Sequence, residues 1–284
     1  MPESLFFLMI LPGCKSMNVY INGVQHTDVD SPTIAHLQQQ YCPGADVTIV
    51  NCLIATDLTS SVSEGDHLHF LKKGVLPEHG ELESLIFSRQ PYAITRRLKA
   101  ACVGIAGAGG LGSVVAENLA RSGVGKLVVA DFDIVEPSNL NRQRYNLAHL
   151  GMPKVQALVD TIRGYNPYVS VVALQERITF KNSGTLFQGC DIVAECLDNA
   201  ADKALIVSGI LKHMPLTKIV AASGIAGIGD GAAIVVRKIF NRLYLVGDSV
   251  SDADDGAGLF ASRVGIAASQ QSHVIIRLLA GEDI

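Results

Sequence analysis

The residues best suited to chemistry begin with four glycines at positions 107, 109, 110 and 112. They follow an apolar run that starts at Val103, and Ser113–Ser122 then places apolar residues at helical spacing. Glycines let a backbone approach a phosphate closely, and the start of a helix offers free N–H groups to an anion. Asp131 ends the next apolar run, where a carboxylate can hydrogen-bond ribose hydroxyls. This order predicts a nucleotide site but does not distinguish a dinucleotide from ATP, and a glycine turn that binds nothing is the plain alternative.

The elements around this loop alternate between apolar strands and amphipathic helices, which predicts a doubly wound, Rossmann-like α/β sheet. Late strands at Ala233–Arg237 and Leu243–Gly247 suggest that the sheet turns antiparallel near its end. Helices are expected from Lys154, from Ala200 and over Val264–Leu279. We therefore expect the large domain to cover residues 84–284.

A smaller domain is expected over residues 17–75, after an N-terminal extension at 1–16 and before a linker at 76–83. Asn22-Gly23 is a strong hairpin turn between two strand-like runs, and a helix start follows at Ser31. Two strands, a helix and further strands form a β-grasp order. The apolar run Leu5–Leu11 is short for a signal core and has no positive residue before it, so Met17 is taken as the effective start.

Composition excludes several other classes. The net charge of −4 gives no electrostatic case for nucleic acid or an anionic membrane, and no stretch is long enough to span a bilayer. None of the six cysteines forms a C-x-x-C pair, so no zinc is expected, and apolar surroundings favour reduced thiols in the cytoplasm.

Two family resemblances make the prediction specific. Residues 17–75 resemble ThiS-like sulfur carriers at Asn22-Gly23, at the helix after Ser31 and at Glu64-Gly65-Asp66. Such carriers end in a free Gly-Gly, whereas here residues 72–75 read Lys-Lys-Gly-Val and continue. Residues from Ser84 to Leu279 resemble the ThiF/MoeB/HesA family, relatives of the ubiquitin-activating enzymes. The matching motifs are the glycine loop, Asp131-x-Asp133, Asn139-Leu-Asn-Arg142-Gln143, Pro153-Lys154 and Asp198-Asn199.

The second resemblance implies an enzyme that adenylylates the C-terminal glycine of a sulfur carrier with ATP and Mg²⁺. The cofactor-binding residues are then Gly107, Gly109, Gly110, Gly112, Asp131 and Asp133. Asn139, Arg142 and Lys154 meet the triphosphate, Asp198 holds Mg²⁺, and Arg89 reaches the nucleotide of a partner subunit in a homodimer. Taken singly, Arg142 and Lys154 would be surface charges and Asp198 a helix cap.

The pathway expected from the resemblance is thiamin thiazole synthesis, with a ThiS-like carrier ending in Gly-Gly as the partner. Molybdopterin-type or other sulfur carriers are the alternative, and an NAD-dependent oxidoreductase or a non-catalytic binding module explains fewer motifs. No cysteine follows Cys196, so sulfur is expected from a separate donor protein.

Overall fold

The computed structural model describes residues 16–30, 32–252 and 256–284 and divides the chain into two compact units, through Ala93 and from Ile94. Nearly all of the predicted extension at 1–16 lies outside the described residues. Each unit has its own apolar core.

The first unit contains a five-stranded sheet in the order β2-β1-β5-β3-β4, with helix α1 (Ile34–Tyr41) packed on one face. Ile34 and Leu37 of α1 are buried against Val19 and Leu68 of the sheet, as their helical spacing predicts. The strand order confirms the β-grasp prediction, except that the short β4 had no clear signal in the sequence. The strands are β1 (Ser16–Ile21), β2 (Val24–Asp30), β3 (Val47–Val50), β4 (Leu53–Ile54) and β5 (His67–Leu71).

Helix α2 (His79–Ile86) packs against β5 and belongs to the first unit. The Nε2 atom of His69 lies 2.8 Å from Ser84 Oγ, and Asn22 Nδ2 donates to Glu81 Oε1 at 3.1 Å. The chain after β5 therefore folds back onto its own sheet. A turn separates α2 from α3 (Tyr92–Ala100), which starts directly after Pro91, a residue that is tolerated at a helix start but not in its interior.

The second unit is a seven-stranded sheet in the order β11-β12-β10-β9-β6-β7-β8, parallel except for the edge strand β11. The doubly wound α/β prediction is confirmed, including its late antiparallel strand, although β11 starts two residues later than expected. The strands are β6 (Cys102–Ala106), β7 (Lys126–Ala130), β8 (Ser170–Leu174), β9 (Ile192–Glu195), β10 (Lys218–Ala222), β11 (Val235–Phe240) and β12 (Leu243–Gly247).

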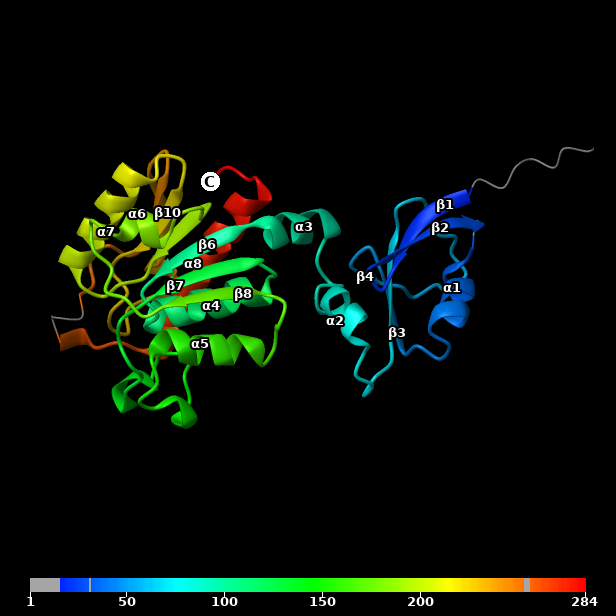
Figure 1. Ribbon diagram of the computed structural model, residues 1–284, viewed down its shortest axis with the longest axis horizontal. Coiled ribbons are helices and arrows are strands. Elements are labelled where there is room, and N and C mark those ends of the chain that lie inside the picture. Colours follow the sequence, from blue (N-terminus) through cyan, green and yellow to red (C-terminus); the bar gives the residue numbers. More distant parts are fainter. Residues whose placement is uncertain (1–15, 31, 253–255) are drawn as a thin grey trace, which may run out of the picture. The chain divides into compact units, whose positions relative to one another are not determined.

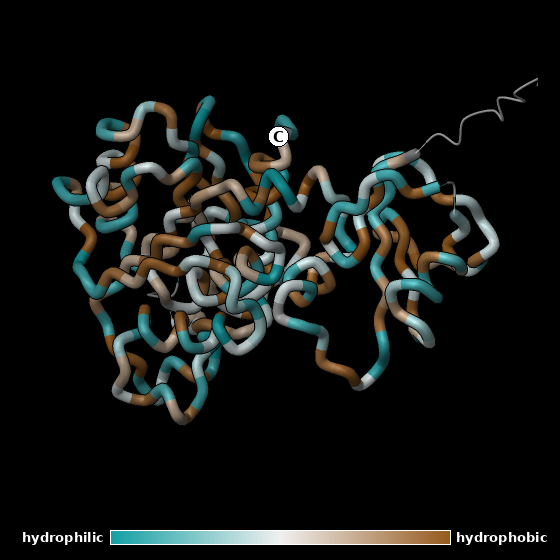
Figure 2. Tube along the Cα trace, turned by 45° about the vertical axis from the view of Figure 1, so that its right-hand side comes forward, coloured by the Kyte–Doolittle hydropathy of each residue, from teal (hydrophilic) through white to brown (hydrophobic). Residues whose placement is uncertain are grey.

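Helices cover both faces of this sheet (Figure 1). On one face, α4 (Gly110–Arg121), α5 (Lys154–Arg163) and α8 (Ala261–Ala280) share a core with β6 and β7. On the other face, α7 (Ala200–His213) packs beside the short α6 (Ser183–Leu186). Apolar segments run through the strands between these layers (Figure 2), as expected for a sheet buried on both sides.

Parallel pairing brings the carboxyl ends of β6, β7, β9 and β10 to the same edge of the sheet. The loops that follow these strands hold most of the candidate site residues. Within the described ranges, no helix is both long and apolar enough to cross a membrane.

The His69–Ser84 contact predicts a pH dependence of the first unit. Burial, and secondarily the charge of His67, lower the pKa of His69 to about 4. The unfolded chain therefore binds this proton more readily than the folded unit, so stability is complete above the unfolded pKa of about 6.5 and declines toward pH 4. We expect a loss of about 2 kcal/mol from His69 over this range, allowing for its residual solvent contact.

This loss of stability is measured by following hydrogen exchange of the β5 and α2 amides at increasing denaturant concentration and at several pH values. His69→Phe should flatten the pH dependence between 6.5 and 4. An equal slope in the wild type and the variant would contradict the assignment to His69.

Candidate active site

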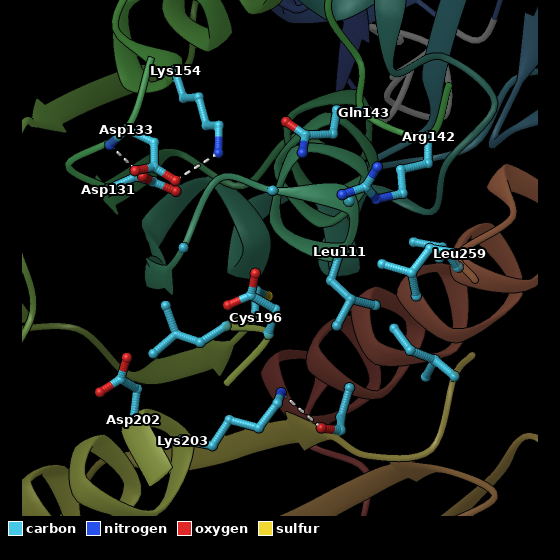
Figure 3. Close-up of a pocket in the computed structure, with 18 of the residues that line it drawn as sticks. Leu111, Asp131, Asp133, Arg142, Gln143, Lys154, Cys196, Asp202, Lys203 and Leu259 are labelled. Atoms are coloured by element: carbon cyan, nitrogen blue, oxygen red, sulfur yellow. Dashed lines mark hydrogen bonds and ion pairs between the residues drawn. The ribbon is translucent and has the colours of Figure 1, made fainter. Parts of the chain in front are cut away.

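A cavity of about 520 Å³ opens where the parallel strands end, a size suited to a nucleotide. Residues from the loops after β6, β7, β8, β9 and β10 line it (Figure 3). The predicted residues brought together here are Gly107, Gly109, Gly110, Asp131, Asp133, Asn139, Arg142, Lys154 and Asp198. Gly112 does not line the cavity. A glycine is required at this position for a different reason, which is the packing of α4 against the loop.

The glycine loop is folded too tightly for side chains at two positions. Gly107 has a φ of +95°, a left-handed conformation that favours glycine. A Cβ atom on Gly112 would lie 1.8 Å from the carbonyl oxygen of Gly107. Gly112 therefore lets α4 begin directly against the loop, while Gly109 and Gly110 leave the backbone open to the cavity.

Asp131 fixes this loop from the end of β7. Its Oδ2 accepts the Ala108 N–H at 2.6 Å, and its Oδ1 accepts the Asp133 N–H at 2.8 Å. Tyr145 holds Ala108 from its other side, since its hydroxyl donates to the Ala108 carbonyl at 2.7 Å. Burial and the Asp131 charge raise the pKa of Tyr145, so its hydroxyl stays protonated as a donor. Nothing in the sequence pattern singled out Tyr145.

Lys154 and Asp133 form an ion pair at one side of the cavity (Figure 3). The distance from Lys154 Nζ to Asp133 Oδ2 is 2.9 Å, and the lysine side chain is only 8% exposed. A second contact, from the Lys154 N–H to the Asp133 carbonyl, ties the start of α5 to the segment after β7. Asp133, predicted as a cofactor-binding residue, therefore lines the cavity and also aims the lysine with its carboxylate.

Arg142 and Gln143 lie over the glycine loop (Figure 3). The Arg142 Nη1 donates to the Ser138 carbonyl at 3.0 Å and to Asn141 Oδ1 at 2.9 Å, which orients the guanidinium. Asn139 is buried, and its Oδ1 accepts the Glu136 N–H, so this amide shapes the loop as well as lining the cavity. Gln143 was not predicted as a site residue; its buried Oε1 has no hydrogen-bond partner among the described residues.

Asp198 follows β9 and is exposed to the cavity. The alternative that it caps α7 is wrong, because Asn199 Oδ1 accepts the N–H groups of Ala201 and Asp202 instead. Within the described ranges, no hydrogen bond or ion pair engages the Asp198 carboxylate, and no cluster of three acidic, histidine or cysteine side chains could hold a metal. The cavity therefore offers Mg²⁺ the free Asp198 carboxylate beside the expected nucleotide. This suits Mg²⁺, which usually keeps several water ligands and binds phosphate oxygens.

The sequence interpretation missed several charged side chains of the cavity, among them Arg177 and Lys203. Arg177 stacks over the ring of Phe132, with its guanidinium carbon 3.9 Å from the ring centre. Lys203 of α7 pairs with the buried Glu195 at the end of β9. Neither belongs to a recognised motif, and only the packing of α7 on the sheet brings Lys203 to the floor of the cavity.

Two residues considered in the sequence analysis, Arg89 and Cys196, take no part in the contacts described above. Arg89 follows α2 within the first unit, so its role toward a partner subunit stays a prediction. Cys196 lines the cavity but is buried, and burial followed by the Glu195 charge raises the pKa of its thiol. Such a thiol is a poor nucleophile at neutral pH.

Comparisons with known proteins agree with the two units. Residues 83–284 match the ThiF family, and residues 17–74 match the ThiS-like ubiquitin family. A molybdopterin-synthase adenylyltransferase of Salmonella typhimurium is 31% identical over 72% of this chain and 86% of its own length. An adenylyltransferase and sulfurtransferase of Yarrowia lipolytica is also 31% identical, over 62% of this chain and 45% of its own. The chain spans less than half the length of the fungal relatives it matches.

Solved structures agree on the fold. The E. coli tRNA N6-threonylcarbamoyladenosine dehydratase, in complex with AMP, has a TM-score of 0.64 and 19% identity. The likeness covers 73% of this chain and 98% of that one. At this identity it shows a shared architecture.

The glycine loop yields a matched pair of variants. Gly112→Ala would force its methyl into the Gly107 carbonyl, and we expect it to destabilise the protein by about 3 kcal/mol. Gly109→Ala meets nothing nearer than Gln143 Nε2 at 3.9 Å, so the fold should survive. Its methyl would stand on the cavity wall and weaken ATP binding by about tenfold, since phosphate needs close backbone approach.

Thermal melts and ATP titration separate the two effects. Equal losses of stability in both variants, or unchanged ATP affinity in Gly109→Ala, would contradict this division of roles.

Proposed function

This chain belongs to the ThiF family, and from that premise we propose that it transfers AMP from ATP to the C-terminal carboxylate of a ThiS-like sulfur carrier protein. The observation that carries the proposal is a nucleotide-sized cavity where a glycine loop faces the fixed cations Arg142 and Lys154 and the free Asp198 carboxylate. The relatives named as adenylyltransferases support the same chemistry.

In this reaction an oxygen of the carrier's terminal carboxylate attacks the α-phosphorus of ATP. The bond from that phosphorus to the bridging oxygen breaks, and pyrophosphate leaves with its electron pair. An acyl-adenylate remains on the carrier. Negative charge grows on the α-phosphate and on the leaving group, so cations fixed in advance lower the barrier.

The described contacts suit Arg142 and Lys154 to this task. Arg142 offers a planar pair of donors to phosphate oxygens, and Lys154 offers a point charge aimed by Asp133. Asn139 completes the polar wall facing the triphosphate. Each cation is already oriented by a backbone or side-chain oxygen, so little reorganisation is needed when the nucleotide enters.

Asp131 takes a double role in the proposal. Both carboxylate oxygens accept backbone N–H groups, which leaves further lone pairs for the ribose hydroxyls. Asp198 would hold Mg²⁺, and a bound Mg²⁺ would supply charge neutralisation at the phosphates. Gly107, Gly109 and Gly110 would let the backbone approach the phosphates.

The partner and pathway follow from the family and its relatives. A carrier with a free Gly-Gly end offers the carboxylate and a tail thin enough to enter the cavity. Thiamin thiazole synthesis remains the proposal from the ThiF and ThiS-like matches, while the Salmonella typhimurium relative favours a molybdopterin-type carrier as the second candidate. An NAD-dependent oxidoreductase accounts for the glycine loop and Asp131 but gives no task to Arg142 or Asp198.

The assembly that we propose is a homodimer in the cytoplasm, where Arg89 of each subunit reaches the nucleotide of the other. Sulfur would come from a separate donor protein. The fused ThiS-like domain is not the substrate of its own chain, because Gly74 continues into Val75 and α2 then packs back on β5. A covalent linker holds it at high effective concentration, so it is suited to docking or regulation.

Pyrophosphate exchange tests this function. Wild-type protein should exchange labelled pyrophosphate into ATP only when a Gly-Gly carrier is added, and a panel of carriers identifies the partner. Asp198→Ala should lower this exchange by at least about a hundredfold, because the Mg²⁺ complex loses its carboxylate. Its melting temperature should stay close to wild type, since Asn199 keeps the helix cap.

Asp202→Ala is the matched control, an acid of the same cavity on the first turn of α7. Normal exchange by Asp198→Ala at ordinary Mg²⁺ would contradict the role of Asp198. Stabilisation of the wild type by NAD but not by ATP–Mg²⁺ would refute the adenylyltransferase proposal.

We further expect the chemistry to stop at the acyl-adenylate within this polypeptide. Cys196 is buried with a raised pKa, and Ser223 stands in the loop after β10. Cys196→Ser should therefore retain carrier adenylylation within about threefold of wild type, with no carrier thioester on non-reducing gels. A covalent carrier adduct that reducing agent removes, located by mass spectrometry, would overturn this expectation.

A further inference from the structure

A buried ion pair lies at the floor of the cavity, outside the residues given a role in the reaction. Glu195 ends β9 and is 1% exposed. Lys203 reaches it from α7, with Nζ 3.2 Å from Oε1 and 3.1 Å from Oε2. Burial raises the pKa of Glu195, while the adjacent Lys203 acts in the opposite direction.

Each partner of this pair also holds one loop of the cavity. Glu195 Oε1 accepts the Leu197 N–H at 2.7 Å, one residue before Asp198. Lys203 Nζ donates to the Ala222 carbonyl at 2.9 Å, one residue before Ser223. The pair therefore joins the loop after β9 to the last residue of β10, where the Ser223 loop begins.

The contacts of Lys203 argue against a direct role in binding phosphate. An ammonium group has three N–H donors, and the three oxygens within 3.2 Å of Nζ all belong to the protein. Lys154, by contrast, has one side-chain contact, to the half-exposed Asp133. Lys203 thus lines the cavity while its donors point into the floor.

A glutamine on α8 contacts the same two strands, β9 and β10. Gln271 is fully buried, and its Nε2 donates to the Glu195 carbonyl at 2.9 Å and to the Val220 carbonyl at 2.7 Å. These hydrogen bonds fix the strand ends through their backbone. The Glu195–Lys203 pair adds a side-chain link at the points where the Asp198 and Ser223 loops leave these strands.

We propose that Glu195 and Lys203 are positioning residues for adenylylation, which fix the Asp198 and Ser223 loops at the separation that the reacting nucleotide requires. This inference rests on the proposed function. Burying two charges is costly, and an apolar pair of similar size often gives equal stability. The geometry that the pair imposes on the cavity is therefore the part that an apolar pair would lose.

Two double variants test this assignment. Glu195→Leu with Lys203→Met removes both charges and also the acceptor for the Leu197 N–H. Glu195→Gln with Lys203→Met removes the charges but keeps an amide oxygen at that place. Lys203→Met alone would leave Glu195 buried and unpaired, so it is not informative.

We expect both double variants to fold, with melting temperatures near wild type. The leucine variant should lose about thirtyfold or more in kcat of pyrophosphate exchange and need about tenfold more Mg²⁺ for half-maximal rate, because a displaced Asp198 is misaligned. ATP affinity should change by less than about threefold, since the glycine loop is untouched. The glutamine variant should recover much of the loss.

A purely structural pair predicts instead that activity follows melting temperature in both variants. Wild-type kcat and Mg²⁺ dependence in a stable leucine variant would overturn the proposal. Hydrogen exchange of the Leu197 amide, measured without substrate, should rise in the leucine variant and not in the glutamine variant. That measurement tests whether Glu195 holds the Asp198 loop even if no carrier supports exchange, so failure of the proposed function is distinguishable.

Discussion

The close approach of α4 to the glycine loop is the constraint on which the second unit depends. Gly112 lies so near the Gly107 carbonyl that only hydrogen fits between them, and Asp131 then holds Ala108 from the next strand. Tyr145 donates its hydroxyl to the carbonyl of the same residue. The loop is consequently rigid before any ligand arrives, and its backbone can meet a phosphate at little entropic cost.

The contacts at this edge of the sheet also orient the charged side chains of the cavity. Lys154 takes its direction from Asp133, which in turn donates its N–H to Asp131. On the opposite wall, the Lys203 ammonium group points toward Glu195 at the floor of the cavity. The Asp198 carboxylate has no hydrogen-bond or ion-pair partner among the described residues. A cavity in which Arg142 and Lys154 are held in place and the Asp198 carboxylate is unengaged suits a triphosphate with a bound divalent ion, and the contacts that arrange these charges come from different strand ends.

The sequence predicted those features that depend on the residues within one helix, strand or motif. The alternation of strands and helices gave the doubly wound sheet, and four motifs placed Asp131, Arg142, Lys154 and Asp198 around one cavity. Contacts between distant segments could not be read. Tyr145 meets Ala108, and Lys203 meets Ala222, only because tertiary packing brings them together. Asp198 and Asn199 are adjacent, and only the geometry shows that Asn199 is the cap.

The first unit shows how a change after the last strand alters the use of a fold. In a chain ending at residue 74 the sheet face beneath α2 would be open, and the tail would be free. Here Ser84 and Glu81 of α2 contact His69 Nε2 and Asn22 Nδ2, and Leu85 is buried. The chain after residue 74 therefore continues into a helix that packs on the domain's own sheet. The substrate that we propose is accordingly a free carrier added from solution.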